Sequence, residues 1–251
     1  MKHFGLILTL LTISVTTNAQ NVVTEIHGKQ IKVDSTVGVV AKIERLVSPY
    51  SAKINKELNK VLAYNPMVLD KSRGASNYQS NIGDLFAQII LDKSNKVLMQ
   101  REKLTADISV FNHGGIRAIL PIGKVTTRNA FEIMPFENSA VVLEVKGQII
   151  LDFVNYFIKE KKRHPIGGMT FVIDAENKPK NIKIGSADLD LEKTYYIATN
   201  DYLANGGDKM DFFLKASKKF VLDYKLRDML IDYFIDVEMV TVPQAVKVVK
   251  E

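Results

Sequence analysis

The chain has 251 residues, of which 46% are hydrophobic and 25% are charged. These values are typical of a globular protein, and the length allows one large domain or two small ones. The absence of cysteine excludes disulfides and thiolate chemistry. The formal net charge is +6 at pH 7, but the basic residues are spread along the chain without a block of five like charges. We therefore expect no nucleic-acid partner.

The first 19 residues have the pattern of a secretory signal peptide. Lys2 gives a basic start, residues 4–15 form an apolar run, and small residues follow at 17–19. The length of the run favours a signal that is cleaved after Ala19 over a short membrane anchor. We expect a periplasmic or secreted protein with no membrane span after signal cleavage, and the cysteine-free composition favours a bacterial periplasm.

The next segments are an N-terminal arm and a helical region. Residues 20–35 are predicted to form the arm, extended or paired as a short strand over 21–34. Apolar residues recur at helical spacing over 36–63, with an interruption expected near Pro49. The further elements expected in chain order are a strand at 67–69, a polar loop at 71–78, a helix from its cap Asn81 to residue 90, a strand at 107–111, a helix at 126–133, a strand at 140–145, a helix at 147–162, strands at 169–173, 182–184 and 195–199, a helix at 226–234 and a strand-like tail at 238–249.

The order of these elements predicts the fold class. Strands and helices alternate without the strict repetition of a βαβ fold, which favours a mixed sheet with helices outside it. No low-complexity linker or internal repeat is present. The sequence therefore predicts one domain over 36–251, of the α+β (mixed α/β) class, with layered mixed sheets flanked by helices. The basic residues at the end of the 147–162 helix suit its dipole, which favours that interpretation over a binding patch: Lys159, Lys161, Lys162 and Arg163.

Two glycine-rich loops, NHGGIR at 112–117 and NGGD at 205–208, each follow a strand-like apolar run. Glycine permits a positive φ and lets a ligand approach the main chain closely. The Arg117 guanidinium could bind an anion through its fork of donors. The Asp208 carboxylate could accept hydrogen bonds from two hydroxyls. Each loop alone could be an ordinary turn, so the case for a ligand site depends on the two occurring together.

Three more side chains could complete such a site. Phe136 and Tyr202 stand in loops, where two aromatic rings could stack on a flat base. Asn112 carries both a donor and an acceptor and could read a base edge or a ribose. The alternatives remain open at this stage: the aromatic residues could belong to the core, and the asparagine could cap a turn.

Metal and nucleophile chemistry is not predicted on this chain. After the signal only His27, His113 and His164 remain, and none lies three or four residues from another histidine. A zinc or dinuclear site needs several histidines and carboxylates that converge. The sequence also lacks cysteine and the G-x-S-x-G pattern. We therefore assign no catalytic residue, no metal ligand and no cofactor to this chain.

Four motifs resemble the C-terminal domain of the 5′-nucleotidase family. Residues 112–117 resemble its N-x-G-G-I-R motif, and residues 133–138 (IMPFEN) resemble its PFGN-like segment. Residues 200–208 (NDYLANGGD) are similar to its N-F-L-A-x-G-G-D loop, and residues 81–85 (NIGDL) to its N-(M/L)-G-N-L helix start. The motifs occur in the family order, and the resemblance covers roughly residues 36–240.

The resemblance implies a role for each candidate residue. Phe136 and Tyr202 would hold the base between them, and Asp208 would bind the ribose hydroxyls. Asn112 and Arg117 would contact the base or ribose and the phosphate side. With the residues that shape the two loops, the predicted substrate-binding set is Asn112, Gly114, Gly115, Arg117, Phe136, Tyr202, Asn205, Gly206, Gly207 and Asp208.

The family also implies an exported enzyme whose N-terminal metallophosphoesterase domain holds two metals. That domain is missing from this sequence, so we expect divalent metals and hydrolysis on a partner metallophosphoesterase subunit. The chain would then be a component of a 5′-nucleotidase-type hydrolase that bears no metal itself. Two alternatives remain: a stand-alone nucleoside- or nucleotide-binding protein without catalysis, and a degenerate relative that binds nothing.

Two further departures from the family pattern concern the loops. His113 stands where small residues are usual. Tyr78 stands where some members place a phosphate-contacting arginine, and Arg73, five residues earlier, is the candidate replacement. Whether phosphate is bound without the usual arginine therefore stays open, whereas tyrosine in place of phenylalanine at Tyr202 should still stack on a base.

Overall fold

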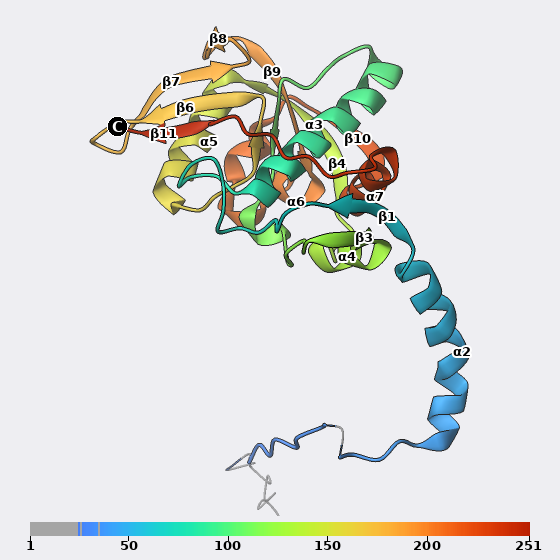
Figure 1. Ribbon diagram of the computed structural model, residues 1–251. Helices are drawn as coiled ribbons and strands as arrows, with labels where there is room; N and C mark the ends of the chain where they lie inside the picture. The colour runs from blue at the N-terminus through green and yellow to red at the C-terminus, as the bar shows by residue number, and fades with distance from the viewer. Residues whose placement is uncertain (1–24, 26, 35) are drawn as a thin grey trace, which may run out of the picture. The chain divides into compact units, whose positions relative to one another are not determined.

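The computed structural model describes residues 25, 27–34 and 36–251. The predicted signal peptide and its cleavage site lie outside these residues. Residues 49–251 form one compact unit (Figure 1), while the predicted domain start at residue 36 stays a prediction. Within the described ranges, no helix combines the length and the apolar character needed to cross a bilayer.

A five-stranded mixed sheet forms the centre of the compact unit, in the order β10-β4-β9-β2-β5. Strand β4 pairs antiparallel with both of its neighbours, β2 runs parallel to β9, and β5 is antiparallel to β2. The bounds are β2 (Ile108–Val110), β4 (Ser139–Lys146), β5 (Ile166–Gly167), β9 (Thr194–Asn200) and β10 (Lys218–Lys225).

Both faces of the central strand β4 are buried. Along β4, Ala140 and Val142 join one core, whereas Val141 and Leu143 join the other, because successive strand side chains point to opposite faces. Helices α3 (Asn81–Glu102) and α7 (Leu226–Asp236) contribute to the first core, and α5 (Gly147–Glu160) to the second. The arrangement confirms the predicted class of layered mixed sheets flanked by helices (Figure 1).

A second sheet, in the order β11-β6-β7-β8, adds its apolar side chains to the core around α5. Its strands are β6 (Met169–Ile173), β7 (Pro179–Ile184), β8 (Ala187–Asp188) and β11 (Val248–Lys250). A separate two-stranded ribbon pairs β1 (Val61–Asn65) with β3 (Gly123–Thr126). The remaining elements are α2 (Ala41–Leu58), α4 (Thr127–Ile133), α6 (Asp201–Ala204) and the 3₁₀ turns η1 (His113–Gly115), η2 (Gly207–Lys209) and η3 (Asp211–Lys215).

Several expected boundaries are wrong. Helix α2 continues through Pro49, since the fixed φ of proline is helical even though its nitrogen donates no hydrogen bond. Val61 and Leu62, counted as helical from their spacing, lie in β1. The cap of α3 is Ser80, whose hydroxyl accepts from the Gly83 N–H. Asn81 instead binds the neighbouring loop through Val68 O and Asp70 N.

Other differences concern strands. The segment 67–69 contains a single bridge, between Leu69 and Leu120, and the tail at 238–249 becomes a regular strand only from Val248. The described part of the N-terminal arm contains no strand. Strands β3, β5, β8 and β10 are not among the predicted strands. In β10 only Phe220 and Leu222 are buried. Charged residues elsewhere in the strand hide this alternation in the sequence, namely Lys218, Lys219, Asp223 and Lys225.

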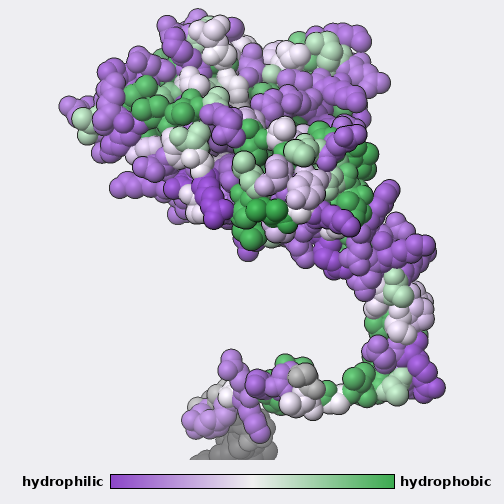
Figure 2. Space-filling view, in the orientation of Figure 1, coloured by the Kyte–Doolittle hydropathy of each residue, from purple (hydrophilic) through white to green (hydrophobic). Residues whose placement is uncertain are grey.

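The face shown in Figure 2 is mostly polar, and the apolar residues of the 49–251 unit lie there in separate patches. Several large aromatic side chains lie inside the molecule. Those that are almost completely buried are Phe111, Phe153, Phe157, Phe171, Phe213 and Phe234.

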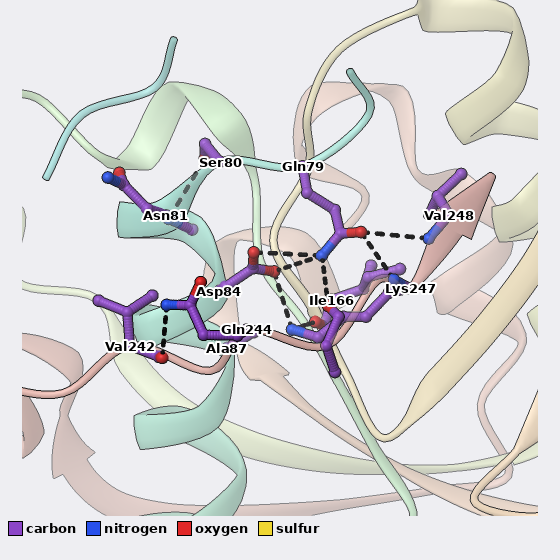
Figure 3. A network of polar contacts seen from close by, with 12 residues as sticks. Gln79, Ser80, Asn81, Asp84, Ala87, Ile166, Val242, Gln244, Lys247 and Val248 are labelled. Atoms are coloured by element: carbon purple, nitrogen blue, oxygen red, sulfur yellow. Dashed lines mark hydrogen bonds and ion pairs between the residues drawn. The ribbon is translucent and has the colours of Figure 1, made fainter. Parts of the chain in front are cut away.

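A buried polar network joins the C-terminal tail to the start of α3 (Figure 3). The Lys247 ammonium donates to Asp84 at 2.9 Å and to the Ile166 carbonyl at 2.7 Å. The Gln79 amide donates to both Asp84 oxygens at 3.1 Å, and its own oxygen accepts from the Lys247 N–H at 2.7 Å. Asp84 and Lys247 are only 3% and 8% exposed, so the network fixes the end of the loop that precedes α3.

The same loop is held near both of its ends by Arg163, which corrects the interpretation of this residue as a helix-dipole charge. Its guanidinium donates to the carbonyls of Lys71, Ser72 and Asn77. Helix α5 already ends at Glu160. Arg163 therefore connects the chain after α5 to the loop at 71–78, which lacks helix and strand as predicted.

Candidate ligand-binding site

A cavity of about 590 Å³ lies where three loop regions meet. They are the turn after β2, the segment between α4 and β4, and the region of α6 and η2. A volume of this order suits a small-molecule ligand. The wall is formed by seven of the predicted residues and two others: Asn112, Gly114, Gly115, Arg117, Phe136, Glu137, Asn138, Tyr202 and Asp208.

The turn after β2 supplies one wall, and its two glycines have different roles. A Cβ at Gly115 would lie 2.3 Å from a ring carbon of Phe111 and 2.9 Å from the Asn112 side-chain oxygen, whereas the nearest atom to a Cβ at Gly114 would be 3.6 Å away. Neither glycine has a positive φ, so the turn does not depend on the left-handed conformation that glycine permits. Glycine at position 115 instead allows close packing against Phe111.

The second loop presents Asp208 to the cavity. Its Oδ2 accepts from the Asn112 amide at 2.9 Å, and its Oδ1 accepts from the Tyr202 hydroxyl at 2.9 Å. Its carbonyl accepts from the Tyr156 hydroxyl at 2.7 Å, and its φ of 53° lies in the left-handed region. The carboxylate is thus held in place while each oxygen keeps a lone pair for a further donor.

Three predicted residues of the second loop do not line the cavity. Gly206 has a φ of 83°, which glycine adopts without strain. Gly207 packs under the aromatic ring of Tyr202, since a Cβ there would lie 2.6 Å from three ring carbons. The Asn205 oxygen accepts from the Lys219 ammonium at 3.2 Å. These residues shape the loop, and any direct contact of theirs with a ligand stays a prediction.

The two predicted stacking residues line the same cavity. Phe136 is 48% exposed and Tyr202 is 45% exposed, which excludes the alternative that they are core residues. Gly207 and the hydrogen bond to Asp208 hold Tyr202 in place. The Arg117 guanidinium lies 5.8 Å from the centre of the Phe136 ring, within the range of a cation–π contact. Both rings can therefore offer a face to a flat ligand.

Sequence reasoning missed two wall residues, Glu137 and Asn138, although both follow Phe136 directly in a quoted motif. Glu137 forms ion pairs with Lys225 and Arg227. Hydrogen bonds from Lys225 and then Arg227 lower the pKa of Glu137 to about 2, so this group remains a carboxylate at neutral pH. The Asn138 amide donates to Asp201 at 2.9 Å, which links the two walls that carry the aromatic rings.

Arg227 is a further residue that sequence reasoning did not find. It is only 6% exposed, and its guanidinium reaches the carbonyls of Met134 and Pro135 at 3.4 Å as well as Glu137. The start of α7 therefore fixes the segment that presents Phe136. The contact spans ninety residues of sequence, so no local pattern indicates it.

Two histidines lie behind the turn after β2. His164 is 3% exposed, and its Nδ1 accepts from the His113 N–H at 3.3 Å. Burial, reinforced by the charge of His113, lowers the pKa of His164 to about 4. Burial and the nearby Lys71 ammonium lower the pKa of His113 as well. Both rings are neutral at pH 7, and neither lines the cavity.

Among residues 25, 27–34 and 36–251, no three histidine, aspartate or glutamate side chains converge in a way that could hold a metal ion. The wall of the cavity itself offers carboxylates, amides, one guanidinium and two aromatic rings. These groups can bind and orient a polar ligand that has a flat ring.

Comparison with known proteins identifies the family. The family described as "5'-nucleotidase, C-terminal domain" matches residues 61–215, which is more than half of the chain. The chain belongs to the 5′-nucleotidase C-terminal domain family. The matched range contains every wall residue of the cavity.

Individual relatives agree with this family. The chain is 26% identical over 191 residues to a 5′-nucleotidase of Vibrio vulnificus, a match that covers 73% of this chain and 32% of the relative. A 5′-nucleotidase precursor of Thermus thermophilus has a similar structure, with a TM-score of 0.69 and 22% identity, covering 82% of this chain and 42% of that one. The NAD nucleotidase of Haemophilus influenzae gives a TM-score of 0.62 and 17% identity, covering 84% and 42%.

This chain is shorter than the relatives that it matches. The chain spans about a third of the length of the curated 5′-nucleotidases that it matches. The solved structures share its fold at low sequence identity. Membership of the 5′-nucleotidase C-terminal domain family is consistent with a nucleotide-binding part of such an enzyme.

Proposed function

We propose that this chain is the nucleotide- or nucleoside-recognition component of an exported 5′-nucleotidase-type phosphohydrolase that acts in nucleotide catabolism. The observation that carries the proposal is the single cavity that Asn112, Phe136, Tyr202 and Asp208 line together. These residues come from three separate regions of the sequence. Their side chains offer what a nucleoside requires, namely aromatic faces for the base and fixed acceptors for the sugar.

The proposed binding mode follows from the contacts in the cavity. The base lies against Phe136 and Tyr202, where stacking contributes roughly 1–3 kcal/mol per base. The ribose hydroxyls donate to Asp208, whose oxygens are already oriented by Asn112 and Tyr202. The amide of Asn112 stays close to both base and ribose. This chain thereby positions the substrate and performs no bond cleavage.

Hydrolysis is assigned to a metallophosphoesterase chain, as the sequence resemblance implies. The divalent metals of that partner would activate a water molecule and stabilise the charge on the phosphate. The residues of the present chain hold the nucleoside so that its 5′-phosphate stays available to the partner. Export to the periplasm or out of the cell is part of the proposal, and the sequence pattern of residues 1–19 supports it.

Phosphate release from AMP in the presence of a divalent metal tests whether hydrolysis requires a separate metallophosphoesterase chain. The purified chain is assayed alone, with a candidate exported metallophosphoesterase, and as a Phe136→Ala variant with that partner. We expect no release by the chain alone, release with the partner, and a clear loss with the variant. Ile235→Ala is the matched control, since Ile235 is an exposed apolar residue outside the cavity wall.

Two outcomes would contradict the proposal. Hydrolysis by the purified chain alone would show that catalysis is not on a partner. Nucleoside binding that persists while no metallophosphoesterase gains activity would favour the stand-alone binding protein.

A further inference from the structure

Glu137 is a charged wall residue to which the proposed binding of base and ribose assigns no role. It lines the cavity directly after the stacking residue Phe136. Its carboxylate forms ion pairs with Lys225 and Arg227, and neither of these two residues belongs to the cavity wall. Even with both partners, 60% of the Glu137 side chain is exposed. A ligand in the cavity therefore meets the carboxylate and not the two cations.

The two cations hold this carboxylate in a fixed direction. Its Oε1 accepts from the Arg227 guanidinium, and its Oε2 accepts from the Lys225 ammonium. Arg227 is buried and also donates to the carbonyls of Met134 and Pro135, so it cannot follow a moving side chain. Each carboxylate oxygen has two acceptor positions, and each keeps one of them after its bond to a cation. Glu137 thus offers a ligand two adjacent acceptors and no donor.

The two amide side chains of the wall already direct donors at carboxylates. The Asn138 amide donates to Asp201 at 2.9 Å, and the Asn112 amide donates to Asp208 at 2.9 Å. Each asparagine has in this way used one of its two donors, while its oxygen remains an acceptor. The wall that follows Phe136 is therefore rich in acceptors, and it suits a base whose edge carries donors.

The carboxylate at this position is a departure from the family motif. The segment that residues 135–138 (PFEN) resemble reads PFGN, so Glu137 stands in place of its glycine. Glycine has no side chain with which to contact a base. Glu137 therefore adds to the cavity wall a charged group that the motif does not contain.

The edges of the common bases differ in what they offer to a carboxylate. Guanine has two adjacent donors, the N1–H and the 2-amino group, which can donate to both oxygens at once, as an arginine fork does. Hypoxanthine lacks the 2-amino group. Adenine has its 6-amino donor beside the acceptor N1, and in uracil the N3–H lies between two carbonyls. Since an acceptor that faces an ionised oxygen is repelled, guanine is the best match for Glu137.

We propose that Glu137 recognises the edge of the base and gives the site a preference for guanine nucleosides and nucleotides. The proposal rests on the proposed function, since the base must first lie against Phe136 and Tyr202. The N1–H donates to one oxygen of Glu137 and the 2-amino group to the other, while Lys225 and Arg227 keep their ion pairs with the carboxylate. A base without the amino group forms one bond fewer to a charged acceptor, so it binds more weakly.

Calorimetric titration with guanosine, inosine and adenosine tests this preference. Wild type should bind guanosine at least about tenfold more tightly than inosine, the scale of one hydrogen bond to a charged group, and adenosine should also bind more weakly than guanosine. In Glu137→Gln, which removes the charge, the difference between guanosine and inosine should fall below about threefold. Glu176→Gln makes the same substitution at an exposed glutamate that pairs with Lys178 on another loop, and it should leave the preference unchanged.

The titrations separate failure of base recognition from failure of the proposed function. Equal affinity of wild type for guanosine and inosine, or an equal loss of both affinities in Glu137→Gln, would overturn the role of Glu137 and leave the nucleoside site standing. Absence of binding of all three nucleosides to wild type would overturn both. Thermal unfolding shows whether each variant is folded. Glu137→Gly, which has the residue of the family motif, should also lose the preference and gives the answer if Glu137→Gln is unstable.

Discussion

Asp208 is the residue on which the binding mode depends most. Both of its carboxylate oxygens, its carbonyl and its backbone conformation are fixed by neighbours. A non-glycine residue in the left-handed region costs free energy unless its surroundings hold it there. Here Tyr156 and Tyr202 hold it from two sides. Such strain at a cavity wall is typical of a position that function maintains.

A change at Phe136 should separate binding from stability. Phe136→Ala removes a half-exposed ring and should weaken nucleoside binding by about 1–3 kcal/mol, the contribution of one stacking partner. Because the ring is outside the core, the free energy of unfolding should change by less than about 1 kcal/mol. Calorimetry and thermal unfolding measure the two quantities. A loss of stability without a loss of affinity would show that the ring supports the fold rather than the ligand.

His164 predicts a dependence of stability on pH. Burial lowers its pKa to about 4 from the ordinary 6.5, so between these values the unfolded chain binds more protons than the folded chain. The contribution is fully present above pH 6.5 and is lost as the pH falls toward 4, with a total of roughly 3 kcal/mol. The measurement is the free energy of unfolding as a function of pH.

His164→Asn is the matched variant for this measurement, because asparagine can still accept a hydrogen bond from the His113 N–H without titrating in this range. The difference in stability between wild type and variant should shrink or reverse as the pH falls from 6.5 to 4. Carboxylates common to both proteins cancel in this difference. A difference that stays constant over the window would contradict the assignment of a buried neutral histidine.

At the scale of elements, two arginines fix the segments around the site. Arg163 binds the carbonyls of the loop before α3, and Arg227 binds those of the segment before β4. Backbone carbonyls in loops have no strand or helix partner, so a buried or half-buried guanidinium with several donors satisfies them efficiently. Arg227 thereby turns an irregular segment into a fixed support for Phe136, and Arg163 fixes the loop at 71–78.

The buried pair of Lys247 and Asp84 should stabilise the contact of the C-terminal tail with α3. Lys247→Met leaves the Asp84 charge buried and without its ionic partner, which should lower the free energy of unfolding by about 3–5 kcal/mol. The double variant Asp84→Asn/Lys247→Met removes that charge and should recover part of the loss. Chemical denaturation measures both changes.

The control for this pair is Lys178→Met, which breaks an exposed ion pair with Glu176 and should change stability by less than about 1 kcal/mol. An effect of Lys247→Met as small as that of the control would show that the network in Figure 3 contributes little to the fold.

At the scale of the whole molecule, the sequence predicted the elements that have strong local patterns. Helices α3, α5 and α7 and strands β4, β6 and β9 carry apolar residues at regular spacing, so their existence could be predicted. Strand β10 could not, because its charged residues interrupt the pattern on the exposed face. The predicted end of α2 is wrong for the opposite reason. The apolar residues Val61 and Leu62 of β1 continue the helical spacing of α2, so the sequence pattern runs on beyond the helix.

The site was predictable where its residues are adjacent in sequence. The two glycine loops and the motif around Phe136 predicted seven of the wall residues. Glu137 and Asn138 follow Phe136 directly and could have been included. The roles of Arg163 and Arg227 could not be predicted, since they arise from contacts between segments that only the folded chain brings together.

The central claim is that one cavity binds a base through aromatic rings and a ribose through Asp208. The most direct measurement is calorimetric titration of adenosine and 2′,3′-dideoxyadenosine into wild type and into Asp208→Asn, a variant whose asparagine tolerates the left-handed backbone. The account predicts that wild type binds adenosine at least about tenfold more tightly than the dideoxy compound, the scale of a lost hydrogen bond to a charged group, and that Asp208→Asn removes most of this preference. Equal binding of the two compounds to wild type, or a preference that survives in Asp208→Asn, would contradict it.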